Sequence, residues 1–285
     1  MTTKKIALIV DSCTDVPPEQ IEEYGMFELP LWVNFKDGSY RDRIDITPQE
    51  VLSRLETEIP KTSLPSPHEI KEVFKRVIDK GFTKAIVVTI SSGLSGTYET
   101  VRMVAQQTNK LDCTVVDTKN IGLGSGFTEI AAGELIKHGV PFENMGKRLL
   151  QFAKDTKIFF SVKTLEYLKA GGRIGEITYL MGNLMDIKPV ISCNNKGVYY
   201  TAKNARGRSA ALKKMVSLAQ NVATDFSNYN VAVMHSGAHD KAQEILNKIK
   251  ELFPGANRVF TGQISPALVV HTGPGLVGIG IQGLE

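Results

Sequence analysis

The sequence predicts an α/β protein of two domains, on three observations. Short β-branched apolar runs alternate with helix-like segments through the first half, which predicts a mainly parallel sheet with helices on both faces. After about residue 157 a hairpin signal adds an antiparallel component. The 285 residues suffice for two hydrophobic cores. We expect an N-terminal domain over 1–157, and a C-terminal α/β domain with a mixed or antiparallel sheet over 158–285.

The first half has a local signal for each element. Thr47 and Glu50 have the spacing of a capping box, and Pro17 and Pro67 stand where helices begin. Asp37-Gly38 closes an early strand as a turn. The expected strands cover 6–11, 28–35, 84–90 and 112–117, and the expected helices start at 17, 47 and 67 and cover 97–109, 126–138 and 142–156.

In the second half, residues 194–197 (Asn-Asn-Lys-Gly) separate two apolar runs and predict a hairpin. Helices are expected over 208–224 and 240–253, with strands near 230–235, 257–261 and 276–281. No Pro/Gly-rich linker separates the halves, so we expect the two domains to pack closely.

Composition excludes several classes of protein. Hydrophobic residues make up 42% of the chain and charged residues 22%, as in ordinary soluble domains, and the net charge of +4 does not by itself indicate nucleic-acid binding. The cysteines, Cys13, Cys113 and Cys193, lack metal-site spacing, so we expect buried thiols and no metal. No apolar run reaches the roughly 18 residues of a membrane span. The apolar run 6–10 is too short for a signal peptide, so we expect a cytoplasmic protein.

The most informative stretch is Ser91-Ser92-Gly93-Leu94-Ser95-Gly96-Thr97-Tyr98, which lies between an expected strand and an expected helix. A helix N-terminus after a strand presents free backbone N–H groups to an anion. The stretch contains three serines and a threonine, but no lysine, arginine or acid. These neutral hydroxyls favour a single carboxylate over a triphosphate.

Two further loops share this chemistry of hydroxyls with glycine or proline. One is Thr62-Ser63-Leu64-Pro65-Ser66-Pro67, and the other is His271-Thr272-Gly273-Pro274-Gly275. Each alone is typical of a turn or a capped helix. Together they predict that Thr62, Ser63, Ser95 and His271 converge on one small anion, which would favour protonation of the histidine.

Other chemistries compete with this interpretation. An acyl hydrolase would use Ser95 and His271, although Thr97 replaces the last glycine of the Gly-x-Ser-x-Gly elbow. Phe127 stands at the third glycine of a dinucleotide fingerprint over 122–127, which disfavours nucleotide binding. The loop acids Asp11, Asp15, Asp42 and Asp45 match no metal motif, and capping or turn roles account for them.

Two stretches allow both a structural and a functional interpretation. The segment 165–175 has a glycine stop followed by a new start, which is typical of a turn between helices. The segment 203–208 (Lys-Asn-Ala-Arg-Gly-Arg), with Lys213 and Lys214, is a basic patch. It is a solvated face or a docking surface for an anionic partner. A regulatory module that binds a small anion or a nucleic acid is therefore a third alternative.

Five motifs in order resemble the DegV family over nearly the whole chain. They are Ile9-Val10-Asp11-Ser12 with Thr14-Asp15, Thr62-Ser63 with Pro65-Ser66-Pro67, Ser91 to Thr97, Leu165-Glu166-Tyr167-Leu168 with Gly171-Gly172-Arg173-Ile174, and His271 to Gly275. The resemblance implies a two-domain α/β architecture that buries one long-chain fatty acid between the domains. It implies a binding protein, not an enzyme, with no catalytic residue and no cofactor apart from the fatty acid.

The same resemblance implies roles for particular residues. Thr62 and Ser95 would hold the carboxylate, with Ser63 and Ser92 nearby and His271 and Thr272 close to the same group. A separate fatty acid kinase would phosphorylate the bound carboxylate for phospholipid synthesis, and Arg206 resembles the arginine used with that partner. No nucleic acid and no integral membrane segment are expected. We expect tail contacts from Phe159, Phe160, Met181, Leu184, Met185 and Ile187, or a plain core role for them.

Overall fold

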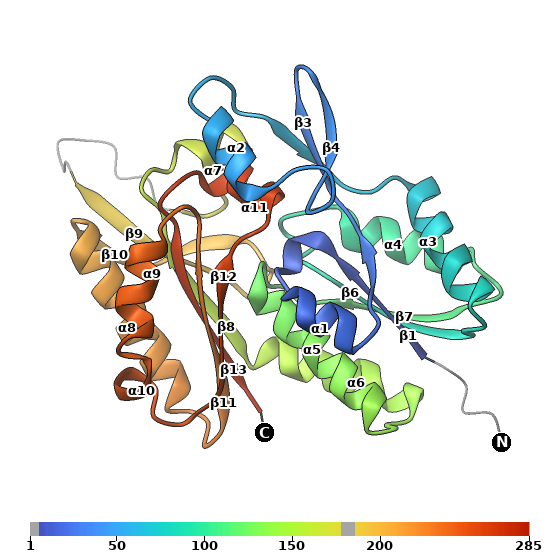
Figure 1. Ribbon diagram of the computed structural model, residues 1–285. Coiled ribbons are helices and arrows are strands. Elements are labelled where there is room, and N and C mark those ends of the chain that lie inside the picture. Colours follow the sequence, from blue (N-terminus) through green and yellow to red (C-terminus); the bar gives the residue numbers. More distant parts are fainter. Residues whose placement is uncertain (1–5, 178–185, 285) are drawn as a thin grey trace.

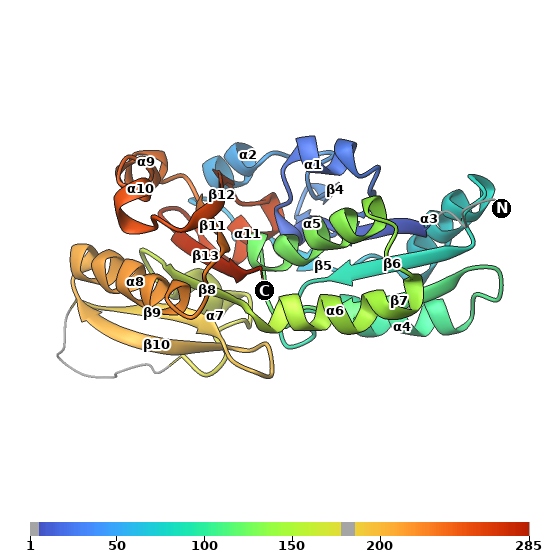
Figure 2. The same ribbon diagram turned by 90° about the horizontal axis from the view of Figure 1, so that it is seen from below.

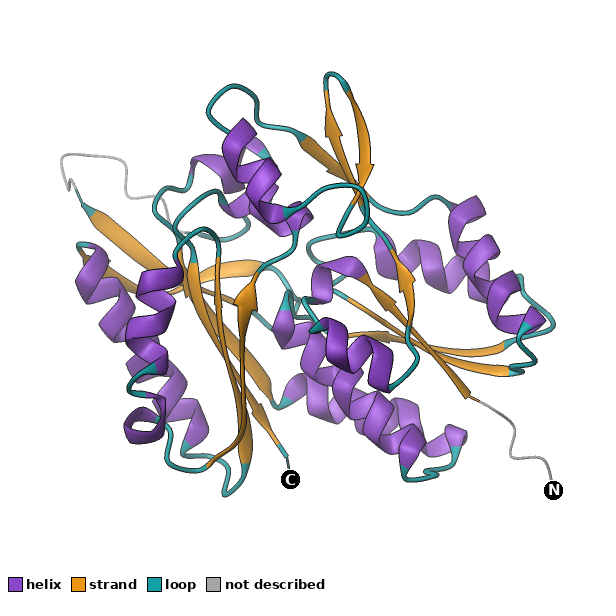
Figure 3. Cartoon of the chain, in the orientation of Figure 1, coloured by secondary structure: helices purple, strands orange, loops and turns teal. Residues whose placement is uncertain are grey.

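The computed structural model describes residues 6–177 and 186–284. The predicted α/β class is confirmed: a parallel sheet and a second, mixed sheet stand side by side, each with its own helices (Figure 1; Figure 3 distinguishes helices from strands). Three of the proposed tail residues, Met181, Leu184 and Met185, lie outside the described residues.

The N-terminal sheet is parallel throughout, with strand order β2-β1-β6-β7. Its strands are β1 (Ile6–Asp11), β2 (Phe27–Leu29), β6 (Lys84–Thr89) and β7 (Asp112–Asp117). Parallel strands are buried on both faces, so they are apolar almost without interruption. β1 packs Ala7 and Ile9 with one set of helices and Leu8 and Val10 with the other.

Helices cover both faces of this sheet. The short η1 (Ser12–Thr14) and α1 (Pro18–Glu23) follow β1. One face carries α3 (Pro67–Asp79) and α4 (Thr97–Gln106), and the other carries α5 (Leu123–Lys137) and α6 (Phe142–Lys154). α5 begins three residues before the expected start, because its glycine-rich first turn is itself helical.

A small antiparallel sheet lies above the parallel one, in the order β4-β3-β5. It consists of β3 (Trp32–Phe35), β4 (Gly38–Arg41) and β5 (Lys61–Ser63), with α2 (Pro48–Arg54) between the last two. The single strand expected over 28–35 is wrong: Pro30 separates β2 from β3, since proline donates no ladder hydrogen bond. The capping box of Thr47 and Glu50 is confirmed.

The C-terminal sheet has the order β10-β9-β8-β13-β11-β12, in which only β11 and β12 run parallel. Its strands are β8 (Thr156–Ser161), β9 (Ile187–Cys193), β10 (Tyr199–Arg206), β11 (Tyr229–His235), β12 (Ala256–Gln263) and β13 (Val277–Gly283). The helices of this half of the chain are α7 (Glu166–Ala170), α8 (Arg208–Ala223), α9 (His239–Leu246), α10 (Ile249–Leu252) and α11 (Pro266–Thr272).

The two sheets share one hydrophobic core at their junction. α5 lies between them (Figure 2) and its Phe127 meets Phe260 of β12 edge to face, with ring centroids 5.6 Å apart. The outer face of the C-terminal sheet packs on α8 through Met215 and the small residues Ala211 and Ala219. The boundary between 157 and 158 stays a prediction; β8, the first strand of the second sheet, starts at Thr156.

Candidate functional site

A hydrogen bond joins two of the predicted site residues across 209 positions of the chain. Thr62 Oγ1 of β5 lies 2.7 Å from His271 Nε2 of α11. β5 is an edge strand of the small sheet, and α11 packs on that sheet and on α7. The histidine lies in the last turn of a helix, not in a loop as the sequence predicts.

His271 is neutral near pH 7. Burial, and secondarily the positive charge of Arg173, lower its pKa to about 4. Its Nδ1 is buried and has no hydrogen-bond partner among the described residues. An anion beside the ring would raise the pKa of His271 again and favour its protonated form, as predicted from the sequence.

The segment after α7 completes this site. A β-carbon added at Gly171 would lie 2.1 Å from His271 Nδ1, so only glycine permits this approach. Arg173 donates from Nε to the Leu94 carbonyl (3.2 Å) and from Nη1 to the Gly171 carbonyl (2.6 Å). We call Thr62, Gly171, Arg173 and His271 the polar cluster.

Two buried carboxylates hold the start of α11. Asp15 Oδ1 accepts the N–H of Ser265 (2.8 Å), and Asp42 Oδ1 accepts the N–H of Ala267 (2.9 Å). A carboxylate at a helix N-terminus satisfies amides that have no partner inside the helix. The expected capping role therefore holds for both acids, and it acts between segments more than 200 residues apart.

Burial keeps these acids unusually weak. It raises the pKa of Asp15 to about 7 and that of Asp42 to about 6. Asp11, at the end of β1, is raised to about 7 for the same reason, although it accepts the N–H groups of Ile90 (2.7 Å) and Cys13 (3.0 Å). Asp45, in contrast, is exposed and pairs with Arg41, which lowers its pKa to about 2.

The amides of the serine-rich loop are largely occupied by the loop itself. Leu94 and Ser95 donate to the Ser91 carbonyl (3.0 and 3.1 Å), and Gly93 donates to Ser91 Oγ (3.0 Å). Ser92 N–H donates to Asp117 (3.1 Å). The expectation that this loop presents free N–H groups is therefore wrong for residues 92–95, because a tight turn uses them.

The loop also contacts the C-terminal sheet. Ser91 Oγ donates to the carbonyl of Gly197 (2.8 Å), at the tip of the β9–β10 hairpin. Lys119 Nζ donates to Ser92 Oγ (2.5 Å) and pairs with Asp117 (2.7 Å). The cation that the loop lacks in sequence is thus supplied by the segment after β7.

Ser95 stands beside the polar cluster without bonding to its histidine. Its Oγ pairs with Thr97 Oγ1 (2.8 Å) and accepts the Thr97 N–H (3.3 Å), while the neighbouring Leu94 carbonyl accepts from Arg173. A hydrolase would require a serine–histidine bond and a group that orients Nδ1 of His271. Thr62 occupies the other ring nitrogen instead.

Ser63 and Thr272 have different surroundings from their neighbours in sequence. Alternation along β5 turns Ser63 outward, where its Oγ accepts from Asn34 (3.2 Å), while Thr62 faces α11. Thr272 is buried and donates to the Leu268 carbonyl (2.9 Å) in its own helix. Thr272 also lines the neighbouring cavity.

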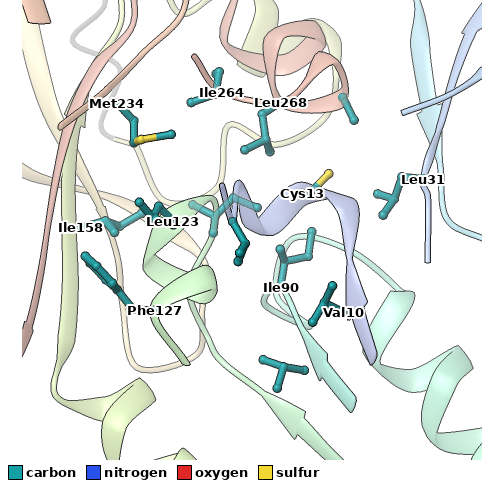
Figure 4. Packing of buried hydrophobic residues seen from close by; sticks show 14 of the residues in the cluster. Val10, Cys13, Leu31, Ile90, Leu123, Phe127, Ile158, Met234, Ile264 and Leu268 are labelled. Atoms are coloured by element: carbon teal, nitrogen blue, oxygen red, sulfur yellow. The ribbon is translucent and has the colours of Figure 1, made fainter. Parts of the chain in front are cut away.

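An apolar cavity of about 60 Å³ lies between α5 and the C-terminal sheet. Figure 4 shows side chains of its wall from four elements: Leu123 of α5, Ile158 of β8, Met234 of β11 and Leu268 of α11. Of the proposed tail residues, Phe159 and Phe160 line the cavity and Ile187 does not.

The two arginines of the basic patch differ in how far they are exposed. Arg206 is exposed at the end of β10, whereas Arg208 is half-buried and donates to the Gly275 carbonyl. Lys214 donates to the Asn204 carbonyl (2.8 Å). The patch therefore contacts the segment after His271 through Arg208 and leaves Arg206 accessible.

Within residues 6–177 and 186–284, no group of three or more His, Cys, Asp and Glu side chains is placed to hold a metal ion. In the same part of the chain no helix is both long enough and apolar enough to cross a bilayer. The three cysteines are unpaired thiols, and two of them, Cys13 and Cys193, are buried.

The roles of Gly171 and Arg173 in this site could not be read from the sequence, because their motif is also typical of a turn between helices. A capping role was expected for Asp42, but nothing local indicated that the capped helix begins 225 positions further along the chain.

The fold and the site define an α/β protein with a parallel sheet, a separate mixed sheet and a polar cluster beside an apolar cavity. The chain matches the family model described as "Uncharacterised protein, DegV family" over residues 5–283. A DegV domain-containing protein of Clostridium acetobutylicum is 39% identical over 279 residues, which are 97% of this chain and 98% of that protein. The chain belongs to the DegV family.

Solved structures have the same fold. A DegV family protein from Thermus thermophilus, described by its fatty acid binding, superposes with a TM-score of 0.92 at 29% identity, covering 98% of this chain and 100% of that one. DegV of Bacillus subtilis, described as a fatty acid binding protein, gives 0.90 at 26%, with 98% and 99% covered. A stearic acid-binding protein from Eubacterium ventriosum gives 0.88 at 26%, with 98% of each chain covered.

Proposed function

We propose that this protein binds a long-chain fatty acid, with the carboxylate at Thr62 and His271 and the tail in the apolar cavity. One observation carries the proposal: His271 lies in the last turn of α11, and the same helix contributes Leu268 and Thr272 to the cavity wall. A single amphiphile could therefore occupy the polar cluster and the cavity together. Similar proteins described as fatty acid binding have the same fold.

The energetics divide between the two ends of such a ligand. Each buried methylene stabilises the complex by about 0.8 kcal/mol, so a dozen give about 10 kcal/mol before ordering costs. A tail of that length is larger than the cavity of about 60 Å³, so the side chains of the wall must move apart to admit it. The hydroxyl of Thr62 and the imidazole of His271 add orientation, with Ser95 and Ser92 in the neighbouring loop and Thr272 at the cavity wall. Ser63 faces away and has no part in this proposal.

Lipid extraction tests the proposal directly. The purified full-length chain is denatured and extracted with solvent, and the lipid is identified by mass spectrometry. We expect about one fatty acid per chain. A folded sample without lipid, which also fails to bind added stearic acid, contradicts the proposal.

The finer proposal is that the bound carboxylate is presented to a separate kinase, with Arg206 as the docking residue. Its support is the exposure of Arg206 at the end of β10 and the contact of Arg208 with the segment after His271. Transfer of radiolabelled phosphate from ATP to the bound fatty acid is measured with a bacterial fatty acid kinase catalytic subunit. R206A should reduce transfer, whereas K203A, on the same strand, should not. Equal rates for both variants contradict the docking role.

A further inference from the structure

One carboxylate oxygen near the cavity lacks a partner. The Asp15 side chain is 7% exposed, and its Oδ1 accepts the N–H of Ser265. Its Oδ2 is buried and has no hydrogen-bond partner among the described residues. Buried polar atoms without a partner are rare, and such an atom at a cavity is a candidate contact for a ligand.

This oxygen lies at the wall of the apolar cavity. A β-carbon added at Gly122 would lie 3.0 Å from Asp15 Oδ2 and 3.5 Å from Leu268 Cδ1, and all three residues line the cavity. Tyr199 and Thr272 are the other polar side chains of the wall, and the Thr272 hydroxyl already donates to its own helix. Asp15 thus places an unpartnered carboxylate oxygen on a surface that is otherwise mainly apolar.

The distance from the polar cluster follows from α11. Asp15 holds Ser265 at the start of this helix, and His271 lies six residues further on. A helix rises 1.5 Å per residue, so the two positions are about 9 Å apart along the axis. An extended chain advances about 1.2 Å per bond, which makes this distance about seven or eight bonds.

We propose that Asp15 Oδ2 is a second polar subsite, which accepts a hydroxyl group on about the eighth to tenth carbon of the bound acyl chain, counted from the carboxyl carbon. The preferred ligand is then a fatty acid hydroxylated near the middle of its chain. This inference rests on the proposed function. A hydroxyl suits Asp15 in either protonation state, since it donates to a carboxylate and accepts from a carboxylic acid. A plain alkyl chain leaves the oxygen unpaired.

Competition binding tests the subsite. Full-length protein, freed of co-purified lipid on a hydrophobic resin, is loaded with a fluorescent fatty acid. Stearic, 3-hydroxystearic and 10-hydroxystearic acid are then titrated as competitors. We expect 10-hydroxystearic acid to bind about tenfold more tightly than stearic acid, since one hydrogen bond contributes about that factor. The 3-hydroxy isomer should show no such gain.

Two variants distinguish the loss of the subsite from the loss of helix capping. D15A should abolish the preference for the 10-hydroxy isomer. D42A removes the other carboxylate that holds α11 but lies outside the cavity wall, so it should weaken all three ligands alike and keep the preference. Equal affinity of the wild type for stearic and 10-hydroxystearic acid overturns the subsite and leaves fatty acid binding intact. That comparison needs no variant, and failure to bind either ligand overturns the proposed function instead.

Discussion

The polar cluster and the apolar cavity both include residues of α11, and they differ in how the chain builds them. The polar cluster joins Thr62, Gly171, Arg173 and His271 from four distant segments, and one close approach decides its geometry. The cavity is the space that large apolar side chains from α5, α11 and the C-terminal sheet leave unfilled between them. The hydrogen-bond geometry of such a cluster is lost when one atom is displaced, whereas the volume of a cavity changes gradually with the size of its wall residues.

The largest expected effect follows from the close approach at Gly171. In G171V the new side chain must displace the His271 ring, because even a β-carbon would lie 2.1 Å from Nδ1. Overpacking at this position should weaken fatty acid binding by about 100-fold. The measurement is titration with a fluorescent fatty acid, and K169A, exposed on the same helix, serves as the control. Wild-type affinity in G171V would show that the polar cluster does not bind the ligand.

The cavity should reveal itself through chain length. Each buried methylene contributes about 0.8 kcal/mol, so affinity should rise about fourfold per carbon and about 200-fold from lauric to palmitic acid. L268N places an amide in the wall and should flatten this dependence. Calorimetry across the series measures it. A slope that L268N leaves unchanged would place the tail elsewhere.

A smaller effect should come from the hydroxyl of the polar cluster. T62V keeps the shape of the side chain and removes the partner of His271, so affinity should fall about tenfold. The loss should be the same for every chain length, in contrast to L268N. S63A is the matched control, because its hydroxyl faces Asn34 on the other side of β5. If S63A and T62V lose affinity equally, then Ser63 also contacts the ligand and the assigned orientation of β5 is wrong.

The smallest effect concerns the acids at the start of α11. A raised pKa means that the folded state favours the protonated carboxyl. The stabilisation of the folded state by the raised pKa of Asp15 is therefore complete below pH 3.8 and is lost as the pH rises through about 7. The free energy of unfolding should fall from pH 5 to pH 8, and less steeply in D15N. Asp11 and Glu129 act in the same direction, so D15N should reduce the slope without removing it. Urea denaturation at several pH values measures it, and an identical slope in D15N would contradict burial as the cause.

Local signals predicted most of the secondary structure. The caps at Thr47 and Ser66 and the buried apolar runs of β1 and β6 depend on neighbouring residues alone, so they are readable in order along the chain. The exceptions arose from contacts. Pro30 interrupts a long apolar run, because the two halves of the run belong to two different sheets. His271 is helical because acids from the first 45 residues cap α11.

For the site, the sequence by itself determined the residue types: hydroxyls with a histidine, no cation in the serine-rich loop, and apolar strands around them. Only the tertiary structure decided their partners. It set Thr62 on His271, turned Ser63 away, supplied Lys119 to Ser92 and left one oxygen of Asp15 facing the cavity. The physical reason is distance along the chain. Propensity and capping act over a few residues, whereas these contacts join segments from 27 to 209 positions apart or face a void that no single segment encloses.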